Sequence, residues 1–204
     1  IHFDDYFYPT TDPSIDAAQF AASGETDLTA WRRANVTRLV KAVHDAVKAA
    51  DPTLRFGVSP QGNPDNDRNE QYTDLSVWLT ASGADAVVDY LCPQIYWGYG
   101  YTLSSGSTRF AFENITAEWL ALPRAERPAL HFGPGASRDG VGDGGANADS
   151  VSQWCTGSAL ARQVTDLRSA GAGGWALYRY GSLFRSDESG LAAAERAALT
   201  ALDG

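Results

Sequence analysis

Hydrophobic positions along the chain follow two spacings, one typical of strands and the other of helices. At the start, Ile1 and Phe3 alternate with polar residues, which predicts a short strand. Residues 28–50 instead place apolar side chains three or four positions apart, which predicts an amphipathic helix that ends at Asp51-Pro52. The apolar positions of this helix are Val36, Leu39, Val40, Val43 and Val47.

The rest of the chain repeats this alternation of strand and helix. Short apolar runs predict strands at residues 55–60, 86–96, 129–133 and 174–180. Helical spacing predicts helices at residues 72–79, 115–122, 160–167 and 191–202. Loops rich in glycine and small polar residues are expected at 61–70, 98–107 and 134–150. Strand and helix therefore alternate five times, which indicates an α/β fold of βα units with a parallel sheet.

Polar and aromatic residues gather where the predicted strands end. In barrels built of βα units, the carboxyl ends of the strands carry the active site. These strand-end residues are Asp4, Asp5, Ser59, Gln94, Tyr96, Trp97, Arg179 and Tyr180. An open doubly wound sheet would show a similar alternation, but the first strand is not followed by a Gly-x-Gly-x-x-Gly turn.

Asp4 and Asp5 are the candidate catalytic residues. Successive residues of a strand point to opposite faces, so we expect His2 and Asp4 to point inward, with Asp5 holding an arginine or reaching the ligand from the loop. Glycosidic cleavage typically uses two carboxyl groups across the scissile bond. The sequence leaves the partner of Asp4 open among Asp65, Asp67, Glu70, Asp89 and Asp139. The alternative is that both aspartates cap loop amides.

The first segment, Ile1-His2-Phe3-Asp4-Asp5-Tyr6-Phe7-Tyr8-Pro9, also carries a family resemblance. Four later segments agree in order: residues 31–36 (WRRANV), 56–60 (FGVSP), 89–97 (DYLCPQIYW) and 178–183 (YRYGSL). Together they resemble glycosyl-hydrolase-like family ten, bacterial (β/α)8-barrel proteins associated with hydrolysis of cell-envelope glycans. In that family the aspartate-pair strand is similar to the fourth strand of the barrel. The resemblance implies that this chain is a partial TIM barrel of about five βα units, the equivalents of strands four to eight, in a single domain over residues 1–204.

The resemblance also implies a function. It points to a glycosidase that acts on a bacterial envelope polysaccharide, with peptidoglycan glycan strands as the expected substrate, and to an exported protein of the cell envelope or extracellular space. Under this interpretation the substrate-binding residues are His2, Tyr6, Ser59, Gln94, Tyr96, Trp97, Arg179 and Tyr180. Trp97, Tyr99 and Tyr101 either stack on sugar rings or pack beneath their loop.

Two other function classes stay open at this point. A metal-assisted hydrolase such as a polysaccharide deacetylase would use Asp4, Asp5 and a histidine as metal ligands. A non-catalytic carbohydrate-binding barrel remnant would use Trp97 and Tyr99 alone. The spacing of the three histidines does not indicate a metal cluster, and we expect His44 on the helix surface. An acidic loop at 139–149 is favoured over a calcium site there.

Composition narrows the choice of partners. The formal net charge of −9 argues against nucleic acid, because phosphate binding requires a basic surface. The sequence has no apolar run of the ~20 residues that a membrane span needs, and no cofactor-binding motif. Cys92 and Cys155 are expected to be free thiols rather than a disulfide. Trp31, Trp78 and Trp119 fall on predicted helices and are expected in the core.

The length agrees with a partial barrel. A complete (β/α)8 barrel usually needs about 250 residues, whereas this chain has 204. Five parallel strands cannot close a barrel of eight, so the first and last strands are expected to present unpaired edges. Such edges predict that this chain either self-associates or is only marginally stable in solution.

Overall fold

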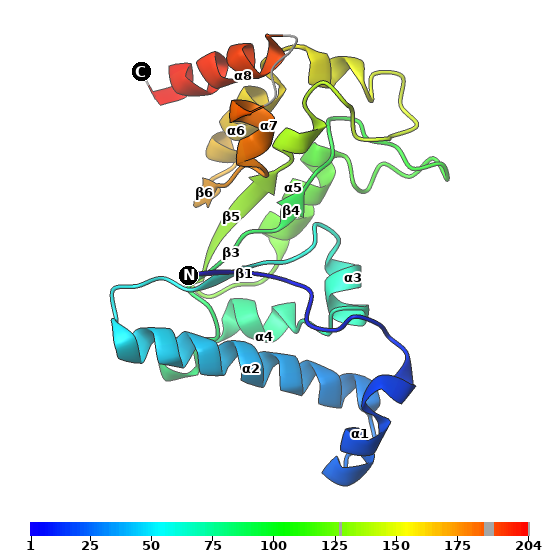
Figure 1. Ribbon diagram of the computed structural model, residues 1–204, viewed down its shortest axis with the longest axis vertical. Coiled ribbons are helices and arrows are strands. Elements are labelled where there is room, and N and C mark those ends of the chain that lie inside the picture. The colour runs from blue at the N-terminus through cyan, green and yellow to red at the C-terminus, as the bar shows by residue number, and fades with distance from the viewer. Residues whose placement is uncertain (127, 186–189, 204) are drawn as a thin grey trace. The chain divides into compact units, whose positions relative to one another are not determined.

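The computed structural model describes residues 1–126, 128–185 and 190–203. Within these residues the chain forms two compact units. The first consists of residues 1–91 and 122–129, and the second of residues 92–121 and 130–204. Each unit combines short parallel strands with helices (Figure 1).

The first unit is built on three strands, β1 (His2–Asp4), β2 (Gly57–Ser59) and β3 (Tyr90–Leu91). β2 pairs in parallel with both of the others. Asp4 lies opposite Ser59, and Gly57 lies opposite Tyr90. The last residues of β1 and β2 are therefore level, which places their following loops at the same end of the unit.

Four helices complete the first unit: α1 (Ala17–Ser23), α2 (Leu28–Ala50), α3 (Pro64–Asn69) and α4 (Leu75–Thr80). Short 3₁₀ turns occur at Pro13–Asp16 and Gly83–Asp85. The side chain of Asp27 begins α2 by accepting a hydrogen bond from the amide of Ala30 at 3.0 Å. Figure 1 shows α4 alongside α2, and Trp78 Nε1 joins them by donating to Thr37 Oγ1 at 2.9 Å.

The second unit also holds three strands, β4 (Gln94–Ile95), β5 (Ala129–Pro134) and β6 (Gly174–Trp175). β5 pairs in parallel with β4 on one side and with β6 on the other. Gln94 lies opposite Gly133, and His131 opposite Gly174. The longest strand is thus the common partner of two very short ones.

The helices of the second unit are α5 (Phe112–Ala121), α6 (Ala159–Ser169), α7 (Tyr180–Phe184) and α8 (Leu191–Thr200). The 3₁₀ turns lie at Ala136–Arg138, Ser152–Cys155 and Ala201–Asp203. Trp154, Leu160 and Leu183 are buried together as a core cluster. The fully buried carboxylate of Glu195, on α8, accepts a hydrogen bond from the amide of Ala161 at 2.8 Å. It therefore caps the first turn of α6.

The predicted fold class is confirmed. Within each unit the described strands pair in parallel and alternate with helices, as in part of a (β/α)8 barrel. Within the described residues, no helix has the length and hydropathy needed to cross a bilayer. Cys92 and Cys155 are free thiols, as expected.

Three predicted elements differ in the structure. The strand expected at 86–96 is split into β3 and β4, because Pro93 has no N–H for a strand ladder. The loop expected at 61–70 contains α3, which Asn63 caps and Pro64 begins. The last strand ends at Trp175, so Tyr180 begins α7 instead of ending a strand.

Burial corrects several side-chain expectations on α2. His44 was expected at the surface but is buried, because it follows Val36 and Val40 at four-residue intervals on the inner face. Leu39, which the apolar spacing assigned to the same face, is exposed. Trp31 is half-buried against Phe20, with ring centroids 5.4 Å apart. The other two tryptophans predicted in the core, Trp78 and Trp119, are fully buried as expected.

Candidate active site

β1 presents its two aspartates to different surroundings. Asp4 is exposed, whereas Asp5 is completely buried. Phe3, on the same face as Asp5, packs edge-on against Phe56 with ring centroids 5.2 Å apart. The strand therefore buries the Phe3–Asp5 face inside the first unit and leaves Asp4 accessible beside Ser59.

Asp5 forms a hydrogen-bonded carboxyl pair with Asp67 of α3. Thr73 Oγ1 donates to Asp5 Oδ1 at 3.0 Å, and the Gln61 amide donates to Asp67 Oδ1 at 2.8 Å. The other oxygen of each carboxyl is buried and has no donor from another group in the described chain. Two carboxyl groups can hydrogen-bond to each other only through a proton, so the pair holds one proton between the two side chains.

The surroundings indicate which aspartate keeps this proton. Burial raises the pKa of both carboxyls. The facing charge of Asp5 raises the pKa of Asp67 further, while hydrogen bonds from Asp67 and Thr73 partly offset the rise in the pKa of Asp5. Asp67 is therefore the protonated donor, and Asp5 the carboxylate that accepts from both Asp67 and Thr73.

Arg32 of α2 fixes the segment that follows β1. Its side chain is fully buried, and its guanidinium forms two hydrogen bonds to the carboxylate of Asp16, at 2.6 and 2.9 Å. Further donations reach the carbonyls of Thr11 (3.2 Å) and Asp12 (2.9 Å) and the hydroxyl of Tyr72 (2.7 Å). One cation thus ties three points of the segment 11–16 to α2.

Two tyrosine rings enclose the same guanidinium. The ring centroids of Tyr8 and Tyr72 each lie 5.0 Å from Arg32 Cζ, and the two centroids are 4.9 Å apart. Tyr72 adopts a left-handed backbone conformation, φ 58°, which is uncommon for a residue with a side chain. Of the two roles expected for Asp5, holding an arginine or reaching the ligand from the loop, the first does not apply to Arg32, whose carboxylate partner is Asp16.

His2 is held by a residue of β3, the strand on the far side of β2. Its Nδ1 lies 3.1 Å from the hydroxyl of Tyr90, and the two rings stack with centroids 5.9 Å apart. Burial lowers the pKa of His2, against the opposing effect of Asp4. A Cβ atom at Gly57 would lie 2.4 Å from the Tyr90 ring, so glycine leaves room for this contact.

The five candidates for a second carboxylate have different surroundings. Asp67 is paired with Asp5, and Asp89 forms an ion pair with Lys48 at 2.7 Å. Asp65 is exposed on α3, and Glu70 lines a cavity just after that helix. Asp139 belongs to the second unit. In the described residues, no three or more His, Cys, Asp or Glu side chains gather as a metal site would require.

In the second unit, aromatic contacts surround the other predicted site residues. Tyr96, just after β4, stacks on Tyr178 beyond β6, with centroids 5.6 Å apart. Trp97 is half-buried and stacks on Phe110 at 5.0 Å, so packing accounts for one face of its ring. Tyr180 is 63% exposed and follows the exposed Arg179. Gln94, on β4, is half-buried.

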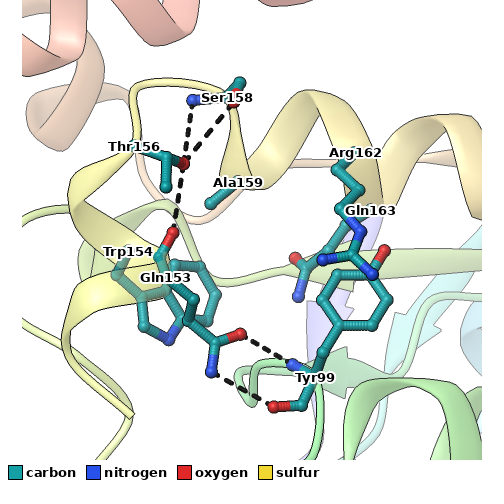
Figure 2. Close-up of a pocket in the computed structure, with 8 residues that line it drawn as sticks. All are labelled: Tyr99, Gln153, Trp154, Thr156, Ser158, Ala159, Arg162 and Gln163. Atoms are coloured by element: carbon teal, nitrogen blue, oxygen red, sulfur yellow. Dashed lines mark hydrogen bonds between the residues drawn. The ribbon is translucent and has the colours of Figure 1, made fainter. Parts of the chain in front are cut away.

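Residues that no sequence pattern indicated hold the loop after Trp97 in place. The Gln153 side chain accepts from the Tyr99 amide at 2.8 Å and donates to its carbonyl at 3.1 Å. Figure 2 shows the Arg162 guanidinium over the Tyr99 ring, 3.7 Å from its centroid, beside a cavity of about 210 Å³. Gln163 completes the anchoring by donating to the Trp97 carbonyl at 2.9 Å.

Asp143 has a similar structural role. Its carboxylate accepts from the Gly98 amide at 2.7 Å, from Trp154 Nε1 at 3.2 Å and from the Gly145 amide at 2.9 Å. The acidic loop therefore contributes a buried anchor for the segment after Trp97. This role of Asp143 could not be predicted from the sequence, because glycine and small polar residues alone indicate only a loop.

Comparison with known proteins identifies the family of this chain. The family model for glycosyl hydrolase-like 10 matches residues 1–113, more than half of the 204-residue chain. The chain belongs to the glycosyl hydrolase-like 10 family. The matched region contains Asp4, Asp5, Arg32, Asp67 and Trp97, whereas Arg179 and Tyr180 lie beyond it.

Two proteins similar in sequence to this chain are glycosyl hydrolases by name. The chain is 29% identical over 187 residues to glycosyl hydrolase YngK of Bacillus subtilis (strain 168), covering 81% of this chain and 33% of that protein. It is 29% identical over 158 residues to glycosyl hydrolase DigH of Escherichia coli (strain K12), covering 65% of this chain and 32% of that protein. The chain thus spans about a third of the length of these relatives.

Substituting Arg32 tests the contacts around the segment after β1. Arg32→Lys keeps the positive charge but loses the planar fork, so the free energy of unfolding should fall by about 2–4 kcal/mol in urea titrations. Arg38→Lys is the matched control on α2, because Arg38 is exposed and its side chain bonds Asn35 at 3.2 Å. A similar small effect of both substitutions would show that the Arg32 contacts contribute little.

The shared proton predicts a dependence of stability on pH. A group whose pKa is raised by folding stabilises the folded state below its unfolded pKa and loses that contribution as pH rises through its folded pKa. The pKa of Asp5 rises to about 6 and that of Asp67 higher still. The free energy of unfolding should therefore fall as pH rises above about 4, the usual pKa of an unfolded Asp carboxyl, with Asp5 contributing up to about pH 6 and Asp67 also beyond it. The fall should reach up to about 1.4 kcal/mol per pH unit for each proton held.

Asp67→Asn should flatten this dependence. The Asn side chain can accept from the Gln61 amide and donate to Asp5 without a bound proton, so the variant should be more stable than the wild type at alkaline pH. Asp65→Asn removes the same charge from an exposed position on α3 and should leave the slope unchanged. Parallel pH profiles for the wild type and Asp67→Asn would contradict the shared proton.

Proposed function

We propose that this chain is part of an exported glycoside hydrolase that cleaves a bacterial envelope polysaccharide, with peptidoglycan glycan strands as its substrate. One observation carries the proposal. In a member of the glycosyl hydrolase-like 10 family, β1 ends in an accessible carboxyl, Asp4, next to the buried pair of Asp5 and Asp67. The names of YngK and DigH as glycosyl hydrolases support the reaction class.

In this proposal Asp4 is the catalytic carboxyl, as acid or nucleophile. It stands at the end of a strand whose other face is fixed by Asp5, and Asp5 is too deeply buried to touch a polysaccharide. Asp5 therefore acts as a positioning residue. Its hydrogen bonds to Thr73 and Asp67 fix the strand end that presents Asp4.

Sugar binding is assigned to polar and aromatic residues at strand ends. In the first unit these are His2, Tyr6 and Ser59, and in the second Gln94, Tyr96, Trp97, Arg179 and Tyr180. Aromatic faces stack on sugar rings, while amide and hydroxyl groups bond to sugar hydroxyls. The exposed ring of Tyr180 and the half-buried ring of Trp97 are suited to stacking.

Asp4→Asn tests the catalytic assignment. The amide cannot donate a proton as an acid or attack as a nucleophile, so turnover of purified glycan strands should fall by about 10²-fold or more with the fold intact. New reducing ends report glycosidic cleavage, whereas released acetate would indicate a deacetylase. Asp65→Asn is the control for loss of one exposed carboxylate, and near-normal turnover by Asp4→Asn would reject the assignment.

Trp97→Ala tests sugar stacking against packing. If the ring stacks on sugar, the variant should bind a soluble glycan fragment more weakly by about 1–2 kcal/mol, measured by calorimetry. Its contact with Phe110 predicts an accompanying loss of stability, for which Phe110→Leu is a reference. Unchanged glycan affinity in a destabilised Trp97→Ala variant would assign the ring to packing alone.

A further inference from the structure

The first unit contains a cavity that the residues assigned above do not explain. Its volume is about 300 Å³, and it is lined by Tyr8, Pro9, Thr10, Thr11, Glu70 and Gln71. One wall is the segment after β1, and the other is the turn after α3. Ligand pockets commonly measure roughly 300–1,000 Å³, so this cavity suits a single sugar unit better than an extended chain.

Both walls are held by the buried interactions already described. Asp5 lies three residues before Tyr8, and its partner Asp67 lies three residues before Glu70. Arg32 bonds the carbonyl of Thr11. The cavity is therefore formed before any ligand arrives, which reduces the entropic cost of binding.

The lining is rich in hydrogen-bond acceptors and has no basic side chain. Glu70 contributes an exposed carboxylate, and Thr10 and Thr11 contribute hydroxyls. The nearest buried cation, Arg32, is bonded to the carboxylate of Asp16. Glu70 is the one charged side chain among the described residues of the lining, so a ligand with a positively charged donor would face it without competition from a lining cation.

Gln71 provides a second, independent observation. It is only 7% exposed, and its Oε1 accepts no hydrogen bond from the described residues although it is buried. A buried acceptor without a donor is costly, on the order of 1–3 kcal/mol. Gln71 lines the cavity, so a donor brought by a ligand would satisfy this oxygen once the side-chain amide turns toward it.

We propose that this cavity binds the unsubstituted, protonated amino group of a hexosamine unit, with Glu70 as counter-ion and Gln71 as hydrogen-bond partner. N-acetylation removes the positive charge and one or more of the donors, so the acetylated sugar binds more weakly. The inference deepens the proposed function and rests on it for one point, that the ligand is a sugar of a glycan. The net charge of −9 also favours approach of a cationic glycan.

Calorimetry with defined oligosaccharides tests the preference. The probes are glucosamine tetramer, N-acetylglucosamine tetramer and a glucose tetramer as uncharged reference, at about pH 6, where the amine is protonated. The wild-type protein should bind the glucosamine tetramer about tenfold or more tightly than the acetylated one. Equal affinity for these two probes would overturn the inference.

Glu70→Gln separates local recognition from general attraction to an acidic protein. The variant should lose the preference for the free amine, and Asp65→Asn should keep it, because Asp65 does not line the cavity although it lies on the helix before Glu70. A preference that survives Glu70→Gln, or falls equally in both variants, would overturn the assignment. If Glu70→Gln is unfolded by circular dichroism, Thr10→Lys, which puts a cation in the cavity, should abolish the preference instead.

Failure of this inference is distinguishable from failure of the proposed function. Asp4→Asn should abolish cleavage while keeping the preference for the free amine. Cleavage that survives Asp4→Asn rejects the catalytic assignment and leaves the preference standing. A wild-type protein without the preference, whose cleavage depends on Asp4, rejects the cavity alone.

Discussion

The first unit depends on a proton shared by two carboxyl groups that have no access to water. Asp5 directly follows β1 and Asp67 lies on α3, more than sixty residues later in the sequence. Without the proton their charges would repel each other in a buried site. With it they form a hydrogen bond between the first strand and the turn after β2. Thr73 and the Gln61 amide satisfy the remaining acceptors, so the arrangement tolerates little displacement of either element.

Arg32 extends this constraint by a different chemistry. A planar guanidinium with several acceptors in fixed positions orders an irregular segment that has few backbone hydrogen bonds of its own. The two buried systems meet at consecutive residues, since Tyr72 bonds Arg32 and Thr73 bonds Asp5. The left-handed conformation of Tyr72 is therefore understandable as the backbone geometry that lets neighbouring side chains reach both partners.

Sequence patterns were sufficient for the fold class and for most helices, because apolar spacing directly reflects which face of an element is buried. They failed where a local signal competed with composition. Asn63 and Pro64 begin α3 inside a stretch whose Asn, Asp and Gly content indicates a loop, and Pro93 interrupts an otherwise continuous apolar strand. The first segment of the sequence was sufficient to predict Asp4 and Asp5 as strand-end carboxyls, but not which of them is buried. That depends on Asp67 and Thr73, whose proximity to Asp5 is tertiary and leaves no periodic trace in the sequence.

The cap that Glu195 places on α6 links two helices that are distant in the chain. The amide of Ala161 finds its acceptor 34 residues later, on α8. The first turn of α6 is consequently completed only after α8 has docked, and fraying of the last helix exposes donors at the start of an earlier one. The two helices thus open and close as one cooperative segment. Docking of α8 therefore governs the protection from hydrogen exchange of amides in the first turn of α6, which lies far from α8 in the sequence.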